Sequence, residues 1–182
     1  GKNSTYVALL KDFNNDGYVD IMNVNCKGEY PDFFEQANEI FLNNGKGVFS
    51  LNQSIGNNIT RGLAAADFDN DGDIDVFVAN IGANDLLIND GKGHFVESSQ
   101  LLPGNNTTCA ATGDIDNDGD FDIIVGNYEE ANLILLNDGN GKFTKSTNYL
   151  GKNTVASVAL GDIDADGDLD VIFGNLGNIN SI

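Results

Sequence analysis

Basic side chains are scarce in this sequence. Nine Lys and Arg residues stand against 28 Asp and Glu residues, which leaves a formal net charge of -19. So few cationic groups cannot neutralise the phosphates of a nucleic acid or the headgroups of an anionic membrane, which argues against both as partners. This charge balance instead favours the binding of cations.

Long apolar runs are missing, and so are the residues of most catalytic sites. No apolar stretch approaches the ~18 residues that span a bilayer, so we expect no direct membrane insertion. The single histidine, His94, is expected to be exposed, and no Ser or Cys nucleophile lies beside a base. We therefore find no catalytic constellation and predict that the protein is not an enzyme. Two cysteines, Cys26 and Cys109, do not make a disulfide framework.

The acidic residues that are present concentrate in four short segments. Eighteen of the 28 lie there, and the segments begin in steps of 55, 47 and 48 residues. A second element, exemplified by "ANDLLINDGKGHF", alternates with them at the same period. Two alternating motifs with one period indicate a structural repeat. The acidic segments span 12–20, 67–75, 114–122 and 162–170, and the second element spans 37–49, 83–95 and 131–143.

Each repeat is predicted to hold four short strands. In the second repeat "GLAAADF" leads into the acidic loop, "IDVFVAN" leads out of it, and "NDLLIN" and "HFVESS" flank an "NDGKG" hairpin turn. Four antiparallel strands in roughly 40–50 residues, repeated, are typical of a β-propeller blade. We predict an all-β, partial β-propeller of three four-stranded blades plus the inner hairpin of a fourth. It forms one domain, 1–182, with repeats at about 5–56, 57–104, 105–151 and 152–182, the last incomplete.

The acidic loops have the pattern of a calcium-binding loop. Carboxylates at positions 1, 3 and 5 can converge on one point when Gly at position 6 makes a sharp turn, position 7 offers its carbonyl, and position 9 closes the loop. The Asp120 side chain at position 7 is then expected to be free to point outwards. An all-oxygen ligand set suits Ca²⁺ better than Mg²⁺. The predicted sites are Asp12, Asn14, Asp16, Tyr18 and Asp20; Asp67, Asp69, Asp71, Asp73 and Asp75; Asp114, Asp116, Asp118, Asp120 and Asp122; and Asp162, Asp164, Asp166, Asp168 and Asp170.

The four loops are not equivalent. In the first loop Asn14 replaces a carboxylate, so three charges should bind Ca²⁺ more weakly than four. We predict up to four calcium sites with a structural role, the first being the weakest. The millimolar calcium outside cells would saturate even weak sites, which favours a secreted or cell-surface protein.

The D-x-D-x-D-G-x-x-D loops and the L-x-N-D-G-x-G-x-F hairpins resemble the FG-GAP/VCBS repeat family. This family includes the propeller heads of integrin α-subunits and certain fungal lectins. The resemblance implies a calcium-binding extracellular module that binds carbohydrate or protein; the alternative is a structural or accessory domain of a larger secreted enzyme or surface protein. Family propellers usually have seven blades. Either the native protein continues beyond Ile182, or two chains associate to close a ring, and we favour association.

A ligand surface is expected on the face opposite the acidic loops. The first repeat carries an insertion on that side, around "CKGEYPDFFEQ" (26–36), whose Tyr30, Phe33 and Phe34 would contact a protein or a sugar, or alternatively cap the blade or fill a subunit interface. Cys26 and Cys109 should both lie near the same face. They are two blades apart, so we expect no disulfide, because the separation exceeds the ~7 Å limit between Cα atoms.

Overall fold

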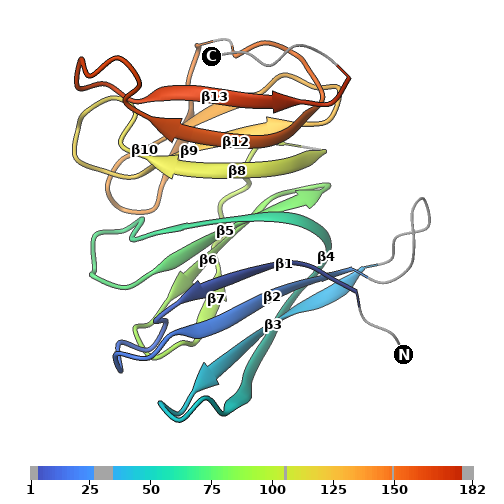
Figure 1. Cartoon of the computed structure of the whole chain (residues 1–182), viewed down its shortest axis with the longest axis vertical. Helices are drawn as coiled ribbons and strands as arrows, with labels where there is room; N and C mark the ends of the chain where they lie inside the picture. The colour runs from blue at the N-terminus through green and yellow to red at the C-terminus, as the bar shows by residue number, and fades with distance from the viewer. Residues whose placement is uncertain (1–3, 27–34, 105, 149, 178–182) are drawn as a thin grey trace.

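The computed structural model describes residues 4–26, 35–104, 106–148 and 150–177 (Figure 1). Within these residues the chain forms thirteen β-strands. All the regular elements among these residues are strands, so the predicted all-β class is confirmed. The described residues hold no helix long and apolar enough to cross a membrane.

Consecutive strands pair antiparallel and group into blades that succeed one another along the molecule (Figure 1). Blade 1 comprises β1 (Ser4–Lys11), β2 (Asp20–Cys26), β3 (Gln36–Asn43) and the first half of β4 (Phe49–Ala66). Blade 2 comprises the second half of β4, β5 (Asp75–Ile81), β6 (Asp85–Asn89) and β7 (Phe95–Glu97). Blade 3 comprises β8 (Thr107–Gly113), β9 (Asp122–Asn127), β10 (Leu133–Asn137) and β11 (Phe143–Lys145), and blade 4 comprises β12 (Val155–Gly161) and β13 (Asp170–Asn175).

Blades 1 and 2 share the 18-residue strand β4, which the sequence does not predict. Its first half pairs with β3, from Phe49 to Asn58, and its second half pairs with β5, from Ile59 to Ala66. Gly56 adopts a φ of 69° at the point where the β3 register shifts. Only glycine takes such a backbone angle without a steric cost. The outermost strand of one blade therefore becomes the innermost strand of the next without an intervening loop.

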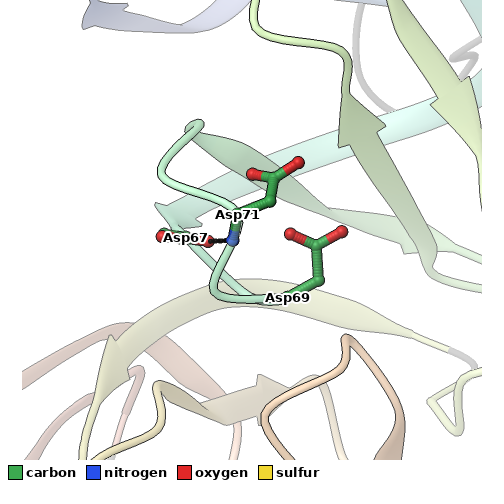
Figure 2. Close-up of side chains that lie close together, drawn as sticks. All are labelled: Asp67, Asp69 and Asp71. Carbon is green, nitrogen blue, oxygen red and sulfur yellow. Dashed lines mark hydrogen bonds between the residues drawn. The ribbon is translucent and has the colours of Figure 1, made fainter.

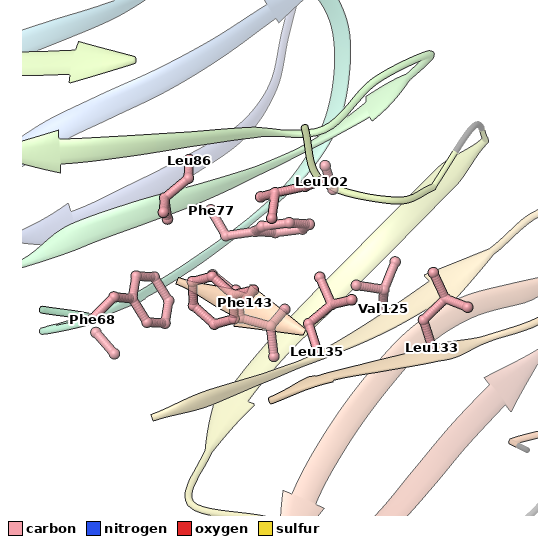
Figure 3. Close-up of a cluster of buried hydrophobic side chains, with 12 residues drawn as sticks. Phe68, Phe77, Leu86, Leu102, Val125, Leu133, Leu135 and Phe143 are labelled. Atoms are coloured by element: carbon pink, nitrogen blue, oxygen red, sulfur yellow. The ribbon is translucent and has the colours of Figure 1, made fainter. Parts of the chain in front are cut away.

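The hydrophobic core lies between blades, because inner strands such as β5 and β9 are buried on both faces. In β5, Val76 and Val78 pack towards blade 1, whereas Phe77 and Ala79 pack towards blade 3, and all four are buried. Alternate side chains of a strand point to opposite faces, so one strand contributes to two cores. Figure 3 shows the core between blades 2 and 3.

Two edge-to-face aromatic pairs repeat at the first two junctions. Phe13 packs on Phe95 and Phe68 packs on Phe143, each with ring centroids 5.4 Å apart and an interplanar angle of 82°. In each pair one ring follows the first Asp of an acidic loop, and the other comes from the outermost strand of the next blade. Such pairs contribute about 0.5–1.5 kcal/mol beyond the burial of their area. Both sequence motifs therefore also have a role in blade packing.

Candidate metal centre

The four acidic segments form the turns between the two innermost strands of each blade, and these turns lie along one side of the molecule, at the left in Figure 1. They connect β1 to β2, β4 to β5, β8 to β9 and β12 to β13. The structure therefore places all the predicted site residues at one end of the blades.

All four loops have one hydrogen-bond pattern, illustrated by the second. The Asp67 carboxylate accepts the N–H of Asp71 at 3.1 Å and that of Gly72 at 2.9 Å, and the Asp71 carboxylate accepts the N–H of Asp73 at 2.9 Å. The backbone passes through positive φ at Asn70 (60°) and at Gly72 (94°). Asp, Asn and Gly fit this turn because short polar side chains satisfy local N–H groups and tolerate left-handed backbone.

The aspartate at position 9 fixes each loop to the adjacent hairpin. The buried Asp75 accepts the N–H of Phe68 at 3.0 Å and that of Asn89 at 2.8 Å. Asp20 and Asp122 make the equivalent pair of bonds, and Asp170 makes the first of them. Asn89 in turn donates to the carbonyl of Phe13 in blade 1 at 2.9 Å. The acidic loop and the L-x-N-D-G hairpin therefore recur together because they are hydrogen-bonded to each other.

Three loops bring carboxylates close enough to share one ion. In each group one ligand oxygen from every member lies within 4.8 Å of the others, and Figure 2 shows the first group. The groups are Asp67, Asp69 and Asp71; Asp114, Asp116 and Asp122; and Asp162, Asp164 and Asp170. Each group holds three of the carboxylates that the sequence assigns to one site.

The first loop differs in the way that its sequence suggests. Asn14 donates from its amide to the Asp16 carboxylate at 3.0 Å and accepts the Asp16 N–H at 3.1 Å. An internal donor therefore satisfies part of the negative charge in this loop. Carboxylates at positions 3 and 5, as in the second loop, have no such donor and repel each other.

Burial and mutual repulsion raise the pKa of several loop carboxyl groups. Burial raises the pKa of Asp75 to about 7, although the N–H groups of Asn89 and Phe68 oppose that rise. The pKa of Asp69 is raised by burial and then by the negative charge of Asp71, and burial also raises that of Asp122. A cation in the loop would reverse the repulsion, so cation and proton would compete for these groups.

One oxygen in the second loop supports this fit between the residues and a cation. Asp69 Oδ1 is buried and has no hydrogen-bond partner. Leaving a buried carboxylate oxygen without a partner is energetically unfavourable. A hard divalent cation would be a suitable partner, because such an ion prefers an all-oxygen donor set.

The expectation that the Asp120 side chain is free is wrong. Asn70 of the second loop donates to Asp120 Oδ1 at 2.8 Å, across the junction between blades 2 and 3. Asn15 donates in the same way to Asp73 at 2.6 Å, and Asn117 donates to Asp168 at 2.6 Å. Position 4 of one loop is thus bonded to position 7 of the next. The recurrence of Asn at position 4 could have indicated this bond, but Asn is also expected there because it favours the turn.

Position 7 also covers the hairpin of its own blade. A Cβ on Gly91 would overlap the Asp73 carboxylate, and one on Gly139 would overlap the carboxylate of Asp120. Tyr18 covers Gly45 in the same way in blade 1. The first glycine of each hairpin turn is therefore required both by its positive φ and by this close approach.

The opposite end of the blades holds a neutral polar network. Thr107 accepts from Asn84 of blade 2 at 3.0 Å and donates to Asn127 of its own blade at 3.0 Å. Thr60 bridges Asn38 and Asn80 in the same way at the first junction. The Asn of the repeated "AN" dipeptide is therefore another residue whose bridging role the sequence alone did not indicate.

The other predicted features of that end are only partly described. Tyr30, Phe33 and Phe34 lie outside the described residues, as does the side chain of Cys26. Cys109 is a free thiol packed against the core between blades 3 and 4, and burial raises its pKa. His94 is exposed, as predicted.

Comparison with protein families decides the identity of the repeat. The model of the FG-GAP-like repeat matches residues 12–78, 67–125 and 114–173. The chain belongs to the FG-GAP repeat family. Each match runs from one acidic loop through the next, so the family unit contains the loop, the hairpin and the junction described above. No curated protein sequence matches the chain.

Solved structures with the same fold include a protein complex and a lectin. A crystal structure of BBS1N in complex with ARL6DN, soaked with lead, matches with a TM-score of 0.60 and 12% identity, over 96% of this chain and 54% of that one. A lectin from Agrocybe aegerita that recognises non-reducing terminal N-acetylglucosamine matches with a TM-score of 0.50 and 16% identity, over 93% of this chain and 60% of the lectin. At these identities the likeness concerns the fold alone. The chain spans little more than half the length of either neighbour, and it is a partial β-propeller module.

Proposed function

We propose that this FG-GAP module is a calcium-stabilised, non-catalytic β-propeller that acts outside the cell and binds a carbohydrate or protein ligand. The observation that carries the proposal is the set of three carboxylate groups in equivalent loops, each with ligand oxygens within 4.8 Å. The buried, unpartnered Asp69 Oδ1 supports it independently of the count of charges.

The residues that would hold the ion are the carboxylates at positions 1, 3, 5 and 9 and the carbonyl at position 7. In the second loop these are Asp67, Asp69, Asp71, Asp75 and the main chain of Asp73. A flexible set of oxygen ligands favours Ca²⁺ over Mg²⁺, which demands near-ideal octahedral geometry. The ion would supply positive charge that the loop itself lacks. Asn14 leaves the first loop with less charge, so its site is the weakest of four.

The role of the ion is structural. Its ligands come from the end of one inner strand and the start of the next, so it binds only when the blade is folded. A ligand that binds only the folded state stabilises it by about 2.7 kcal/mol when its concentration is 100 times its Kd. Sites of modest affinity are useful only where calcium is millimolar, which supports a secreted or cell-surface location.

The ligand class is inferred from the propeller fold. Of the two structural neighbours, one is a lectin and the other is seen in a protein complex. Position 7 side chains at the loop end are already hydrogen-bonded between blades. The ligand is therefore sought on the opposite face. The loop carboxylates are committed to local N–H groups and to the cation, which supports a non-catalytic role.

Titration calorimetry of the chelator-treated protein with calcium tests the central claim. We expect three strong sites and one weaker site. The double variant Asp114→Asn, Asp116→Asn should lose one strong site, whereas Glu97→Gln, which removes an exposed charge outside the loops, should lose none. Absence of calcium uptake by the native protein would refute the proposal.

A glycan array separates the two ligand classes. Calcium-dependent retention of defined glycans would support a carbohydrate ligand, whereas a clean array would leave protein ligands as the class to test. The variant Asp114→Asn, Asp116→Asn serves as a control, because a weakened blade should reduce binding without abolishing it.

A further inference from the structure

The asparagine of the L-x-N-D-G hairpin in blade 3, Asn137, lies between two successive acidic loops and is 6% exposed. Its Nδ2 donates to the carbonyl of Phe68 in the second loop at 2.8 Å and to that of Phe121 in the third loop at 3.1 Å. Its main-chain N–H donates to the Asp122 carboxylate at 2.8 Å. One residue is therefore bonded to both loops at the junction between blades 2 and 3.

The junction between blades 1 and 2 has the same arrangement. Asn89, which is 3% exposed, donates from Nδ2 to the carbonyl of Phe13 in the first loop at 2.9 Å and to that of Ile74 in the second loop at 3.2 Å. Its main-chain N–H donates to the Asp75 carboxylate at 2.8 Å. In both cases the bonded carbonyls belong to position 2 of one loop and position 8 of the next. We call Asn89 and Asn137 the hairpin asparagines.

The acceptor atom of each hairpin asparagine is unused. Asn89 Oδ1 and Asn137 Oδ1 are buried and have no hydrogen-bond partner. The opposite orientation of either amide would place Oδ1 against two carbonyl oxygens, which accept and cannot donate. A buried oxygen without a partner is unfavourable, so the amide is retained at a cost. Its two bonds to successive loops are the contribution that offsets this cost.

The bonds of Asn137 end on groups that belong to the two candidate cation sites. The Phe68 carbonyl lies in the chain between Asp67 and Asp69, which are two members of the carboxylate group of the second loop. Asp122, which accepts the main-chain N–H of Asn137, is a member of the group of the third loop. The hydrogen bonds therefore run from a ligand of one site, through one side chain, to the backbone between two ligands of the other.

We infer that the hairpin asparagines couple calcium binding in successive loops, so that an ion in either loop raises the affinity of the other. This inference rests on the calcium sites of the proposed function. In an empty third loop, repulsion between carboxylates favours an open arrangement, which displaces Asp122 and Phe121 and releases Asn137 from Phe68. An ion closes the loop, and Asn137 then holds the second loop in the form that binds. Such coupling is reciprocal, because it is a difference in binding free energy.

Direct electrostatics has the opposite sign. Two divalent ions bound in neighbouring loops repel each other, so without the hairpin asparagines each ion would weaken the binding of the other. Salt screens that repulsion. The bond from Asn137 to Phe68 is buried, so coupling through it should persist at high salt.

Two glycine amides report on the two loops separately. The N–H of Gly72 donates to Asp67 at 2.9 Å, and that of Gly119 donates to Asp114 at 3.1 Å, so each depends on the conformation of its own loop. A calcium titration of the chelator-treated protein, followed by nuclear magnetic resonance of these amides, gives an affinity for each loop.

Removal of one site measures the coupling at the other. Asp114→Asn combined with Asp116→Asn removes the third site and leaves the bond from Asn137 to Asp122 in place. We expect calcium affinity of the second loop, read at Gly72, to fall about tenfold. Reciprocal removal of the second site, by Asp67→Asn with Asp69→Asn, should lower the affinity of the third loop by the same factor. Equal second-loop affinity with and without the third site would overturn the inference, although calcium binding itself would stand. Absence of calcium uptake by the native protein would instead refute the proposed function.

The variant Asn137→Leu tests the path of the coupling. It removes both amide donors with little change in volume, and the Phe68 carbonyl keeps the N–H of Gly141 at 2.8 Å. In this background, removal of the third site should change second-loop affinity by less than about twofold. Asn137→Ala is a second variant with the same expectation, and circular dichroism checks that both are folded.

The variant Asn70→Gly is the matched control at the same junction. Asn70 donates to Asp120 and to the carbonyl of Gly139 through exposed bonds that do not reach the backbone between ligands. This variant should therefore keep the full coupling of about tenfold. Coupling that survived both changes at Asn137, or that was lost in Asn70→Gly alone, would overturn the role of the hairpin asparagine.

Discussion

The two ends of the blades differ in their polar chemistry. At the loop end, carboxylates converge, their pKa values rise, and Asp69 Oδ1 is left buried without a partner. At the other end, neutral Thr and Asn side chains satisfy one another, as Thr107 does between Asn84 and Asn127. One end therefore has the composition of a cation site, whereas the other satisfies its polar groups as the chain folds.

This difference indicates which end of the blades should change in stability with salt and calcium concentration. A neutral network has the same stability in any salt or calcium concentration, because its partners are internal. A carboxylate cluster is destabilised by mutual repulsion until an ion or protons neutralise it. We therefore expect calcium to act on one end of every blade and to leave the other unchanged.

Removal of calcium is expected to have the largest effect. With three strong sites at 100 times their Kd, chelation should lower the free energy of unfolding by about 8 kcal/mol in all. Thermal unfolding with and without chelator measures the total. Hydrogen exchange then resolves the two ends: the amides of Gly72 and Gly119 should lose protection, whereas that of Asn127 should lose little. Equal loss of amide protection at both ends would contradict the expectation that calcium acts on the loop end alone.

The substitution Thr107→Val tests the neutral Thr and Asn network at the end of the blades opposite the acidic loops. The change keeps the β-branched shape but removes the hydroxyl, so the buried side chains of Asn84 and Asn127 each lose one hydrogen bond, which should cost about 1–3 kcal/mol. The loss should be the same with and without calcium. Thr144→Val, in an exposed position of β11, is the matched control. A loss that appeared only without calcium would contradict the independence of the two ends.

The sequence predicted the acidic loops better than the neutral network, for a physical reason. A loop such as 67–75 is local, so its ligands, glycine and turn can be identified from spacing within nine residues. The bonds from Asn70 to Asp120 and from Asn84 to Thr107 join residues 50 and 23 positions apart. Their partners depend on how one blade packs on the next, which no local pattern encodes. The sequence did not predict the continuous strand β4, because Gly56 and its neighbouring Asn residues also favour a turn.

Asp69→Asn gives the second loop the position 3 residue of the first. The new amide can donate to Asp71 as Asn14 donates to Asp16, and one negative charge is lost. We expect calcium affinity at this site to fall about tenfold, and the reciprocal Asn14→Asp to raise affinity in the first loop by a similar factor. Calorimetry measures both. Asp73→Asn, which changes only a side chain outside the ligand set, is the control. Equal effects of Asp73→Asn and Asp69→Asn would refute the assignment of ligands.

The smallest expected effect concerns the bond that links one loop to the next. Asn70 contributes both a donor to Asp120 and a left-handed turn, so Asn70→Ala would confound the two. Asn70→Gly keeps the turn accessible and removes the amide, which donates to both Asp120 and the carbonyl of Gly139, and each lost bond should cost about 0.5–1.5 kcal/mol of stability. Because Asn70 is at position 4 and ligates nothing, calcium affinity of the second loop should be unchanged in calorimetry while the melting temperature falls. A fall in affinity without a fall in apo stability would mean that the bond serves the cation site and not the junction between blades 2 and 3.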